Sequence, residues 1–239
     1  MIAVTGGNGT LARMLRAFLP DDTRYFSRQE WDVRDWTTAP YPNGIDTVIH
    51  AGALTDHQHP NAAEIIETNI LGTQHVARWC QAHGVKMVYL STHYVYPGER
   101  GNYAEHDECR PIGTYAWSKF AGEGWAAHVF DHLIIRGSWY SEDKLAKMAH
   151  GALRDAWHNR ETPRKAAEKI AFLTTKGATG TYNIGGSRQT FFDLVFANGI
   201  LPNGILRKDL NPRLPYPFPI DTSLNDDKFC AFVADQDSL

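Results

Sequence analysis

The first twenty residues contain the feature that most constrains the fold. The first four residues are apolar, and residues 1–5 predict a buried strand, which leads directly into the turn Gly6-Gly7-Asn8-Gly9. A helix is predicted after the turn, with an apolar side made of Leu11, Leu15, Phe18 and Leu19, and Pro20 is expected to end it. A strand, a glycine turn and a helix in this order are typical of a dinucleotide-binding βα unit.

Each small residue of this motif has a physical role. Gly6 allows the tight turn, Gly9 lets the backbone approach a pyrophosphate, and Ala12 lets the helix pack on the strand. The free N–H groups at the helix start then face the phosphates. We therefore expect Gly6, Gly9, Thr10 and Leu11 to contact a dinucleotide. An ordinary glycine-rich turn without a ligand is the alternative.

The end of the second predicted strand, residues 23–26, bears on the choice of cofactor. Folds that prefer NAD usually carry an acidic residue at this point to hold the ribose 2′-hydroxyl. Here Ser27 and Arg28 follow instead, and a hydroxyl beside a guanidinium suits a 2′-phosphate. We expect NADPH. Glu30 and Asp32 lie slightly downstream, so NADH remains an alternative.

Strands and helices alternate along the first 140 residues. Further strands are predicted at 46–50, 86–90 and 132–136, separated by a long helix at 62–80 and another that starts near residue 114. This alternation predicts an α/β fold, a Rossmann-type doubly wound parallel sheet with right-handed crossovers. We assign residues 1–140 to a dinucleotide-binding domain.

The alternation weakens in residues 141–239, which we assign to a small substrate-binding lobe. Helices are predicted at 145–157, 163–174 and 191–197, with a strand at 181–184. The region around 163–185 is expected to return to the sheet. Five prolines between residues 202 and 219 favour extended backbone in a loop-rich end.

The candidate chemistry lies at Tyr115 and Lys119, at the start of a predicted helix with Thr114 as its N-cap. Residues four apart project from one helix face, and an ammonium beside a phenol favours the ionised phenol. Thr92 follows a predicted strand, where its hydroxyl can bond a carbonyl substrate. The alternatives are an aromatic ring packed on an aliphatic stem and an ordinary strand threonine.

Taken together, these stretches resemble an extended short-chain dehydrogenase/reductase, within the NAD-dependent epimerase/dehydratase superfamily. The similarity is greatest to the dTDP-4-dehydrorhamnose reductase group. The stretches that carry it are spread along most of the chain: Thr5-Gly6-Gly7-Asn8-Gly9-Thr10-Leu11-Ala12, Val48-Ile49-His50-Ala51-Gly52-Ala53-Leu54-Thr55-Asp56, Leu90-Ser91-Thr92-His93-Tyr94-Val95-Tyr96, Tyr115-Ala116-Trp117-Ser118-Lys119 and Ser223-Leu224-Asn225-Asp226-Asp227-Lys228-Phe229.

The resemblance implies reduction of a nucleotide-linked 4-keto-6-deoxy sugar by NAD(P)H. Thr92, Tyr115 and Lys119 would form the catalytic triad. The other positions implied to bind the cofactor are Asp32, Val33, Ala51, Gly52 and Ala53, and those implied to contact substrate are Thr55, His93 and Trp139. His93 departs from the aspartate common in the family, and the short chain puts the sugar and nucleotide specificity in doubt.

Composition restricts the partners. The net charge of −3 gives no reason to expect nucleic acid or an anionic membrane surface, and the three scattered cysteines predict neither a metal site nor disulfides. No leader is recognisable at the N-terminus, so we expect a cytoplasmic protein, and a homodimer is common in the superfamily. Two other functions remain open: an epimerase or dehydratase with tightly bound NAD, and a non-catalytic dinucleotide-binding regulatory subunit.

Overall fold

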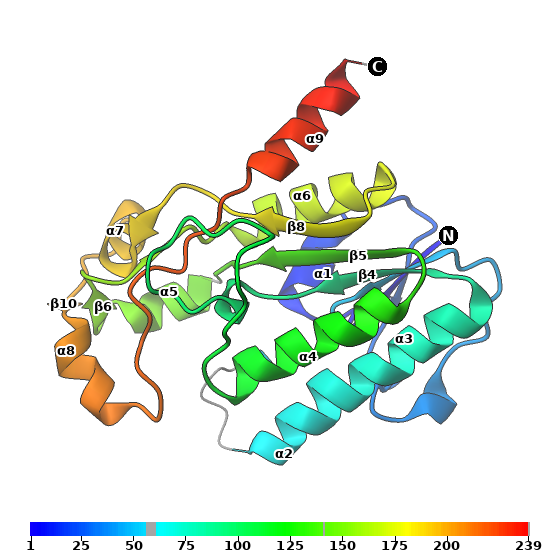
Figure 1. Cartoon of the computed structure of the whole chain (residues 1–239), viewed down its shortest axis with the longest axis horizontal. Coiled ribbons are helices and arrows are strands. Elements are labelled where there is room, and N and C mark those ends of the chain that lie inside the picture. The colour runs from blue at the N-terminus through cyan, green and yellow to red at the C-terminus, as the bar shows by residue number, and fades with distance from the viewer. Residues whose placement is uncertain (56–60, 141, 239) are drawn as a thin grey trace.

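A six-stranded parallel sheet forms the centre of the molecule (Figure 1). The computed structural model describes residues 1–55, 61–140 and 142–238. In spatial order, the strands are β2 (Arg24–Phe26), β1 (Ile2–Thr5), β3 (Thr47–His50), β4 (Lys86–Leu90), β5 (His132–Gly137) and β8 (Gly180–Ile184). All adjacent pairs in this sheet are parallel, which confirms the predicted Rossmann-type doubly wound sheet.

Helices cover both faces of the sheet. On one face, α1 (Thr10–Leu15) and α6 (Pro163–Thr175) pack on a core that includes Val4, Ile49 and Leu133. On the other face, α3 (Gly72–His83) lies beside α4 (Thr114–His128) in Figure 1, over a core that includes Ala3 and Val48. Neighbouring residues of one strand therefore face opposite layers, as the period of two in a strand requires.

The order of the strands places a crevice beside the glycine turn. The chain passes from β1 outward to β2 and then returns to β3 on the other side of β1. In sheets of this kind, ligands bind at the carboxyl ends of the strands, where the strand order reverses. Gly6, after β1, and Ala51, after β3, lie at this point, so topology alone brings the two predicted cofactor-binding stretches together.

Three predicted helices differ from the structure. The helix after the glycine turn ends at Leu15, and only turns continue toward Pro20. The stretch 62–80 is not one α-helix: α2 (Ala62–Ile65) passes into a π-helical segment, Ile66–Leu71, and then into α3. The prediction for 145–157 is wrong beyond its first turn, because α5 (Glu142–Met148) ends there and two short strands follow.

Residues 152–205 form two small two-stranded sheets beside the main one. β6 (Ala152–Leu153) pairs with β10 (Gly204–Ile205), and β7 (Trp157–His158) pairs with β9 (Gln189–Thr190). Helix α7 (Phe191–Ala197) follows β9, at the bounds predicted from sequence. Because α6 and β8 from the same part of the chain belong to the main sheet layer, the division at residue 140 stays a prediction.

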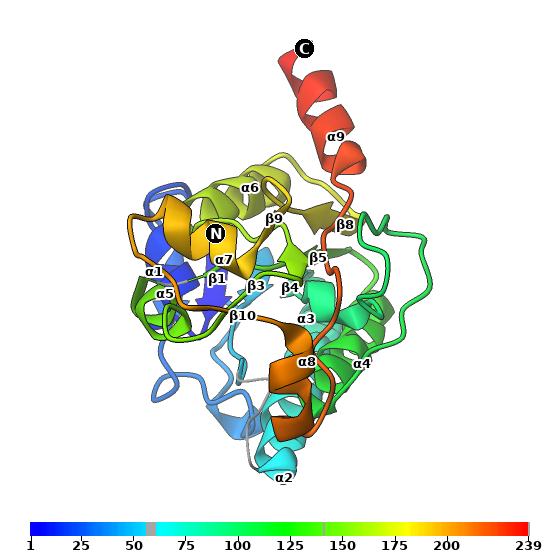
Figure 2. The ribbon, with the colours of Figure 1, turned by 90° about the vertical axis from the view of Figure 1, so that its left-hand side faces the viewer.

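The C-terminal part carries two helices that were not predicted. Helix α8 (Arg207–Leu210) lies between Pro202 and Pro212, where extended backbone was predicted, and α9 (Asp227–Asp237) projects from the body in both views (Figures 1 and 2). Only Phe229 of α9 is buried, against the α6 side of the core. Within the described ranges, no helix has the length and apolar character needed to cross a lipid bilayer.

Candidate active site

The glycine turn has the geometry that a pyrophosphate requires. Gly6 has a φ of +66°, and a Cβ there would lie 2.8 Å from the Gly52 Cα atom, so a side chain would separate β1 from β3. A Cβ on Gly9 would meet only the Gly6 carbonyl oxygen, at 3.1 Å. Gly9 precedes α1 and offers no side-chain cap, so the N–H groups of Thr10 and Leu11 begin the helix uncapped by a side chain. These residues fit a dinucleotide.

The acidic side chains of Glu30 and Asp32 contact the residues directly after β2, Ser27 and Arg28, although they lie downstream in the sequence. The Ser27 N–H donates to Glu30 Oε2 at 2.8 Å, and Arg28 Nε lies 3.3 Å from Asp32 Oδ2. Asp32 is held mainly by Arg34, whose Nη2 lies 2.6 Å from Oδ2, and these hydrogen bonds keep the pKa of Asp32 well below its ordinary value. Arg28 is 63% exposed, so its guanidinium is free to turn toward a phosphate.

Val33 and the residues after β3 line the crevice next to this turn. Val33 is buried, and a Cβ added to Gly72 would lie 2.8 Å from its Cγ2 atom. Ala51, Gly52 and Ala53 are half-buried at the carboxyl end of β3. Their lack of large side chains leaves room there, as the sequence indicated.

A buried hydrogen-bond chain fixes the position of the β3 end, and sequence reasoning missed it. Thr5 Oγ1 accepts from the Gly52 N–H at 3.1 Å and lies 2.8 Å from His50 Nδ1. Thr73 Oγ1 lies 3.1 Å from His50 Nε2 and donates to the Asn69 carbonyl at 2.6 Å. Burial, with the Lys119 charge, lowers the pKa of His50 to about 3, so its ring is neutral.

Asn69 continues the chain to the helix that carries the candidate catalytic residues. It lies in the π-helical segment and is fully buried. Its Oδ1 accepts from the Leu54 N–H at 2.8 Å, and its Nδ2 donates to Ser118 Oγ at 3.0 Å. Ser118 in turn donates to the Tyr115 carbonyl at 2.7 Å. Hydrogen bonds of the Asn69 side chain therefore connect Leu54, after β3, with Ser118 on α4.

Thr92 and Tyr115 lie at the carboxyl end of β4. Thr92 is 4% exposed and Tyr115 is 8% exposed. Burial raises the pKa of Tyr115 to about 12, while a hydrogen bond with Thr92 and the charge of Arg160 act in the opposite direction. Tyr115 is therefore a neutral phenol at pH 7. The expected N-cap is wrong: Gly113 precedes the helix, and Thr114 is its first residue.

Lys119 lies one turn further along α4 and is 3% exposed. Its Nζ atom is 4.3 Å from the centre of the Tyr89 ring. Burial lowers the pKa of Lys119 to about 7, and the Glu123 carboxylate partly opposes this shift. The charge that favours ionised Tyr115 comes from Arg160 and not, as expected from sequence, from Lys119.

The three residues implied to contact substrate lie in different surroundings. Thr55 is exposed, and it is the last described residue before the gap at 56–60. His93 is buried, with its ring 4.1 Å from the Tyr94 ring. Trp139 is half-buried and packs against the core on the α1 and α6 side. This packing is an alternative to a role in substrate contact.

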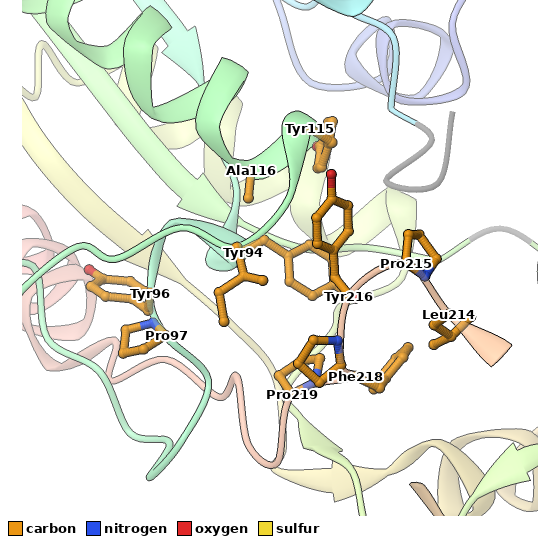
Figure 3. A pocket seen from close by; sticks show the side chains of 12 residues that line it. Tyr94, Tyr96, Pro97, Tyr115, Ala116, Leu214, Pro215, Tyr216, Phe218 and Pro219 are labelled. Atoms are coloured by element: carbon orange, nitrogen blue, oxygen red, sulfur yellow. The ribbon is translucent and has the colours of Figure 1, made fainter. Parts of the chain in front are cut away.

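A small pocket of about 50 Å³ opens beside Tyr115 (Figure 3). Tyr94, Tyr96 and Ala116 line one wall, and residues 214–219 line the other. None of these six C-terminal residues was predicted from sequence to belong to a site; the three prolines among them were predicted only to favour extended backbone. They are about 100 residues from Tyr115 along the chain, so only the folded topology shows that they meet.

Arg160 is a second functional candidate that the sequence did not indicate. Its Nη2 donates to the Tyr94 hydroxyl at 3.0 Å, and its guanidinium lies 4.9 Å from the centre of the Phe191 ring. The Arg160 Nε atom is buried and has no hydrogen-bond partner in the part of the chain that the structure describes. No carboxylate of the described residues forms an ion pair with Arg160. A buried donor of this kind suits an anionic ligand.

The described residues include no group of three His, Cys, Asp or Glu side chains that could hold a metal ion.

The model of one family, described as the RmlD substrate binding domain, matches residues 1–176 of the 239-residue chain. The chain belongs to the RmlD substrate binding domain family. This confirms the resemblance to the dTDP-4-dehydrorhamnose reductase group.

Proteins similar in sequence to this chain include reductases of nucleotide-linked sugars. A dTDP-4-dehydrorhamnose reductase of Mycobacterium tuberculosis is 32% identical over 151 residues, which are 58% of this chain and 49% of the relative. A dTDP-4-keto-6-deoxy-D-glucose reductase of Streptomyces niveus is 26% identical over 80% of this chain and 75% of its own. The chain spans about half the length of the first of these relatives.

Solved structures agree with the fold. A dTDP-4-dehydrorhamnose reductase of Bacillus anthracis, in complex with NADP, superposes with a TM-score of 0.86 over 97% of this chain and 92% of its own, at 21% identity. A hypothetical dTDP-4-dehydrorhamnose reductase of Sulfolobus tokodaii gives a TM-score of 0.83 at 25% identity, over 96% and 93% of the two chains.

Proposed function

We propose that this chain reduces a nucleotide-linked 4-keto-6-deoxy sugar with NAD(P)H. One observation carries the proposal: a neutral, buried Tyr115 beside Thr92 lies at the same edge of the sheet as the glycine turn. The similarity to dTDP-4-dehydrorhamnose reductases supports the substrate class.

The proposed roles follow from the protonation of each group. Bound NAD(P)H supplies the hydride. Tyr115 holds its proton at neutral pH, so it gives that proton to the oxygen of the reduced carbonyl, while Thr92 positions this oxygen by a hydrogen bond. Lys119 would hold the nicotinamide ribose. General acid help of this kind contributes roughly 10²–10⁴-fold in rate.

NADPH is the proposed cofactor, with NADH as an alternative. The exposed Arg28 guanidinium supports recognition of a 2′-phosphate, and the solved relative in complex with NADP is consistent with it. Glu30 favours the alternative, because its carboxylate already accepts the Ser27 N–H that a phosphate would use. Asp32 and Val33 would face the adenine, and Ala51–Ala53 would border the cofactor.

The substrate's diphosphate provides an acceptor for the uncompensated Arg160. The Arg160 Nε donor is buried, and no carboxylate of the described residues pairs with this side chain. Both observations support the binding of an anion next to Arg160 and Tyr94. Thr55, His93 and Trp139 stay proposed substrate contacts. We also propose a cytoplasmic location and a homodimer.

The direct test is the loss of nicotinamide absorbance when the protein is mixed with NADPH or NADH and dTDP-4-keto-6-deoxy-L-mannose. We expect turnover, and faster turnover with NADPH. Absence of turnover with both cofactors would overturn the proposal. Protein purified with bound NAD that does not exchange would instead indicate an epimerase or dehydratase.

A further inference from the structure

Residues 214–219, Leu-Pro-Tyr-Pro-Phe-Pro, form a strap that crosses the mouth of the pocket beside Tyr115. In Figure 3, the Tyr216 side chain stands at the centre of the strap with its hydroxyl directed toward Tyr115. Tyr94 lies on the facing wall, from the turn that follows β4. Two aromatic rings from distant parts of the chain therefore bracket the space next to the candidate proton donor.

The backbone of the strap is held in place at its C-terminal end. The Phe218 N–H donates to Asn211 Oδ1 at 2.8 Å, and the Ile220 N–H donates to the Gly98 carbonyl at 2.7 Å. Pro215 and Pro217 on both sides of Tyr216 restrict its backbone further. The backbone at Tyr216 thus has little conformational entropy left to lose when a ligand binds.

The Tyr216 side chain, in contrast, is only loosely held. Its ring lies against Gly113, where a Cβ atom would be 2.9 Å from Tyr216 Cδ2. Its hydroxyl is 3.5 Å from Thr114 Oγ1, at the limit of a hydrogen bond, and the residue is 42% exposed. A fixed backbone with a movable ring suits a wall that adjusts to a ligand.

Tyr216 also divides two spaces. It is the one residue common to the described linings of the pocket beside Tyr115 and of an open groove of about 390 Å³ over Ile66 and Trp117. The pocket itself, about 50 Å³, has room for one or two waters, whereas ligand pockets measure about 300–1,000 Å³. Rotation of the Tyr216 ring toward the groove would join the two spaces and enlarge the pocket beside Tyr115.

We propose that Tyr216 is a specificity-determining residue: its ring turns aside to admit the pyranose of the substrate and then packs against that sugar, opposite Tyr94. The inference rests on the proposed function. It predicts that Tyr216 acts on the sugar and not on the nucleotide, because the pocket that it closes is the one beside Tyr115.

The test compares Tyr216→Ala and Tyr216→Phe with the wild type. The KM for dTDP-4-keto-6-deoxy-L-mannose and the inhibition constant of dTDP alone are measured for each. We expect Tyr216→Ala to raise KM about tenfold, the scale of one aromatic contact, with Tyr216→Phe within about twofold of wild type. The inhibition constant of dTDP should stay unchanged in both. Tyr41→Ala, at a residue that is 78% exposed, is the control and should match the wild type in both constants.

An unchanged KM in Tyr216→Ala, with an active wild type, would overturn the inference. Equal increases in KM and in the dTDP inhibition constant would also overturn it, since Tyr216 would then support the whole lobe rather than the sugar. An inactive wild type would contradict the proposed function itself and the inference with it. Thermal unfolding of each variant separates these outcomes from loss of fold.

Discussion

Burial, more than any neighbouring charge, sets the protonation of Tyr115 and Lys119. It raises the pKa of the phenol to about 12 and lowers that of the ammonium to about 7. Both shifts favour the uncharged group, as desolvation does. The site is thereby prepared with a phenol that can donate a proton. Lys119 lies at the midpoint of its titration near neutral pH.

The shifted pKa of Lys119 predicts a pH-dependent stability. Between pH 7 and 10.5 the unfolded chain binds a proton that the native chain lacks, so the free energy of unfolding rises with pH across this window. Below pH 7 the full destabilisation is present. We expect wild type to gain up to about 1.4 kcal/mol per pH unit relative to Lys119→Met in this window, as measured by urea unfolding. Parallel curves for the two proteins would contradict the shift.

Arg28 tests the choice of cofactor at a single exposed side chain. Among the described residues, its guanidinium forms an ion pair with Asp32 alone, at 3.3 Å, so removing it should leave the turn intact. We expect Arg28→Ala to weaken NADPH binding about tenfold, the scale of one charge-assisted contact, and to leave NADH binding within about twofold. Titration of nicotinamide fluorescence measures both affinities. Equal losses for the two cofactors would show that Arg28 does not contact a 2′-phosphate.

At the level of whole elements, local sequence pattern predicted the sheet well and the connections poorly. Strand β4 and helix α7 match their predicted bounds because apolar pattern and end signals agree there. The stretch 62–80 looked like one helix because a π-helical segment keeps a helical apolar pattern. The π-helical segment contains buried Asn69, whose side-chain hydrogen-bond partners Leu54 and Ser118 are 15 and 49 residues away. The residue pattern within one segment gives no information about contacts with such distant residues.

The candidate site shows the same difference between regular elements, which local pattern predicts, and irregular segments, which it does not. Its glycine turn, Thr92, Tyr115 and Lys119 stand at ends of strands and on one helix face, where spacing alone places them. Arg160 and Tyr216 come from irregular segments that reach the site through tertiary packing. Sequence spacing could therefore place the proposed cofactor-binding and catalytic residues at one edge of the sheet, but it could not indicate Arg160 or Tyr216.

An ion pair between elements makes a prediction about stability. Arg136 on β5 donates to Glu123 on α4 through Nη2 at 2.7 Å and Nε at 3.0 Å, and both side chains are less than 10% exposed. Arg136→Met leaves the carboxylate buried without its partner, so we expect a loss of about 3–5 kcal/mol in the free energy of unfolding. Urea denaturation measures this loss.

The matched control is Arg110→Met, which breaks an ion pair with Glu99 whose side chains are both more than half exposed. There we expect a change of about 0–1 kcal/mol. Equal losses in Arg136→Met and Arg110→Met would contradict the structural importance of the buried pair.

Across the whole molecule, the cofactor side and the substrate side of the site are built differently. The glycine turn, β3 and α4 are joined by buried hydrogen bonds through His50 and Asn69. The pocket beside Tyr115, where we propose that the sugar binds, is lined by the strap, and Arg160 reaches the neighbouring Tyr94 hydroxyl from the segment after β7. The chain spans about half of the M. tuberculosis relative in alignment.

The most direct test of the account is the rate of NADPH oxidation by wild type and by Tyr115→Phe with dTDP-4-keto-6-deoxy-L-mannose. The change removes only the hydroxyl, so NADPH affinity should stay within about twofold while kcat falls by about 10²-fold or more, the contribution of a general acid. Wild-type turnover that survives unchanged in Tyr115→Phe would contradict the assignment of Tyr115 as the proton donor.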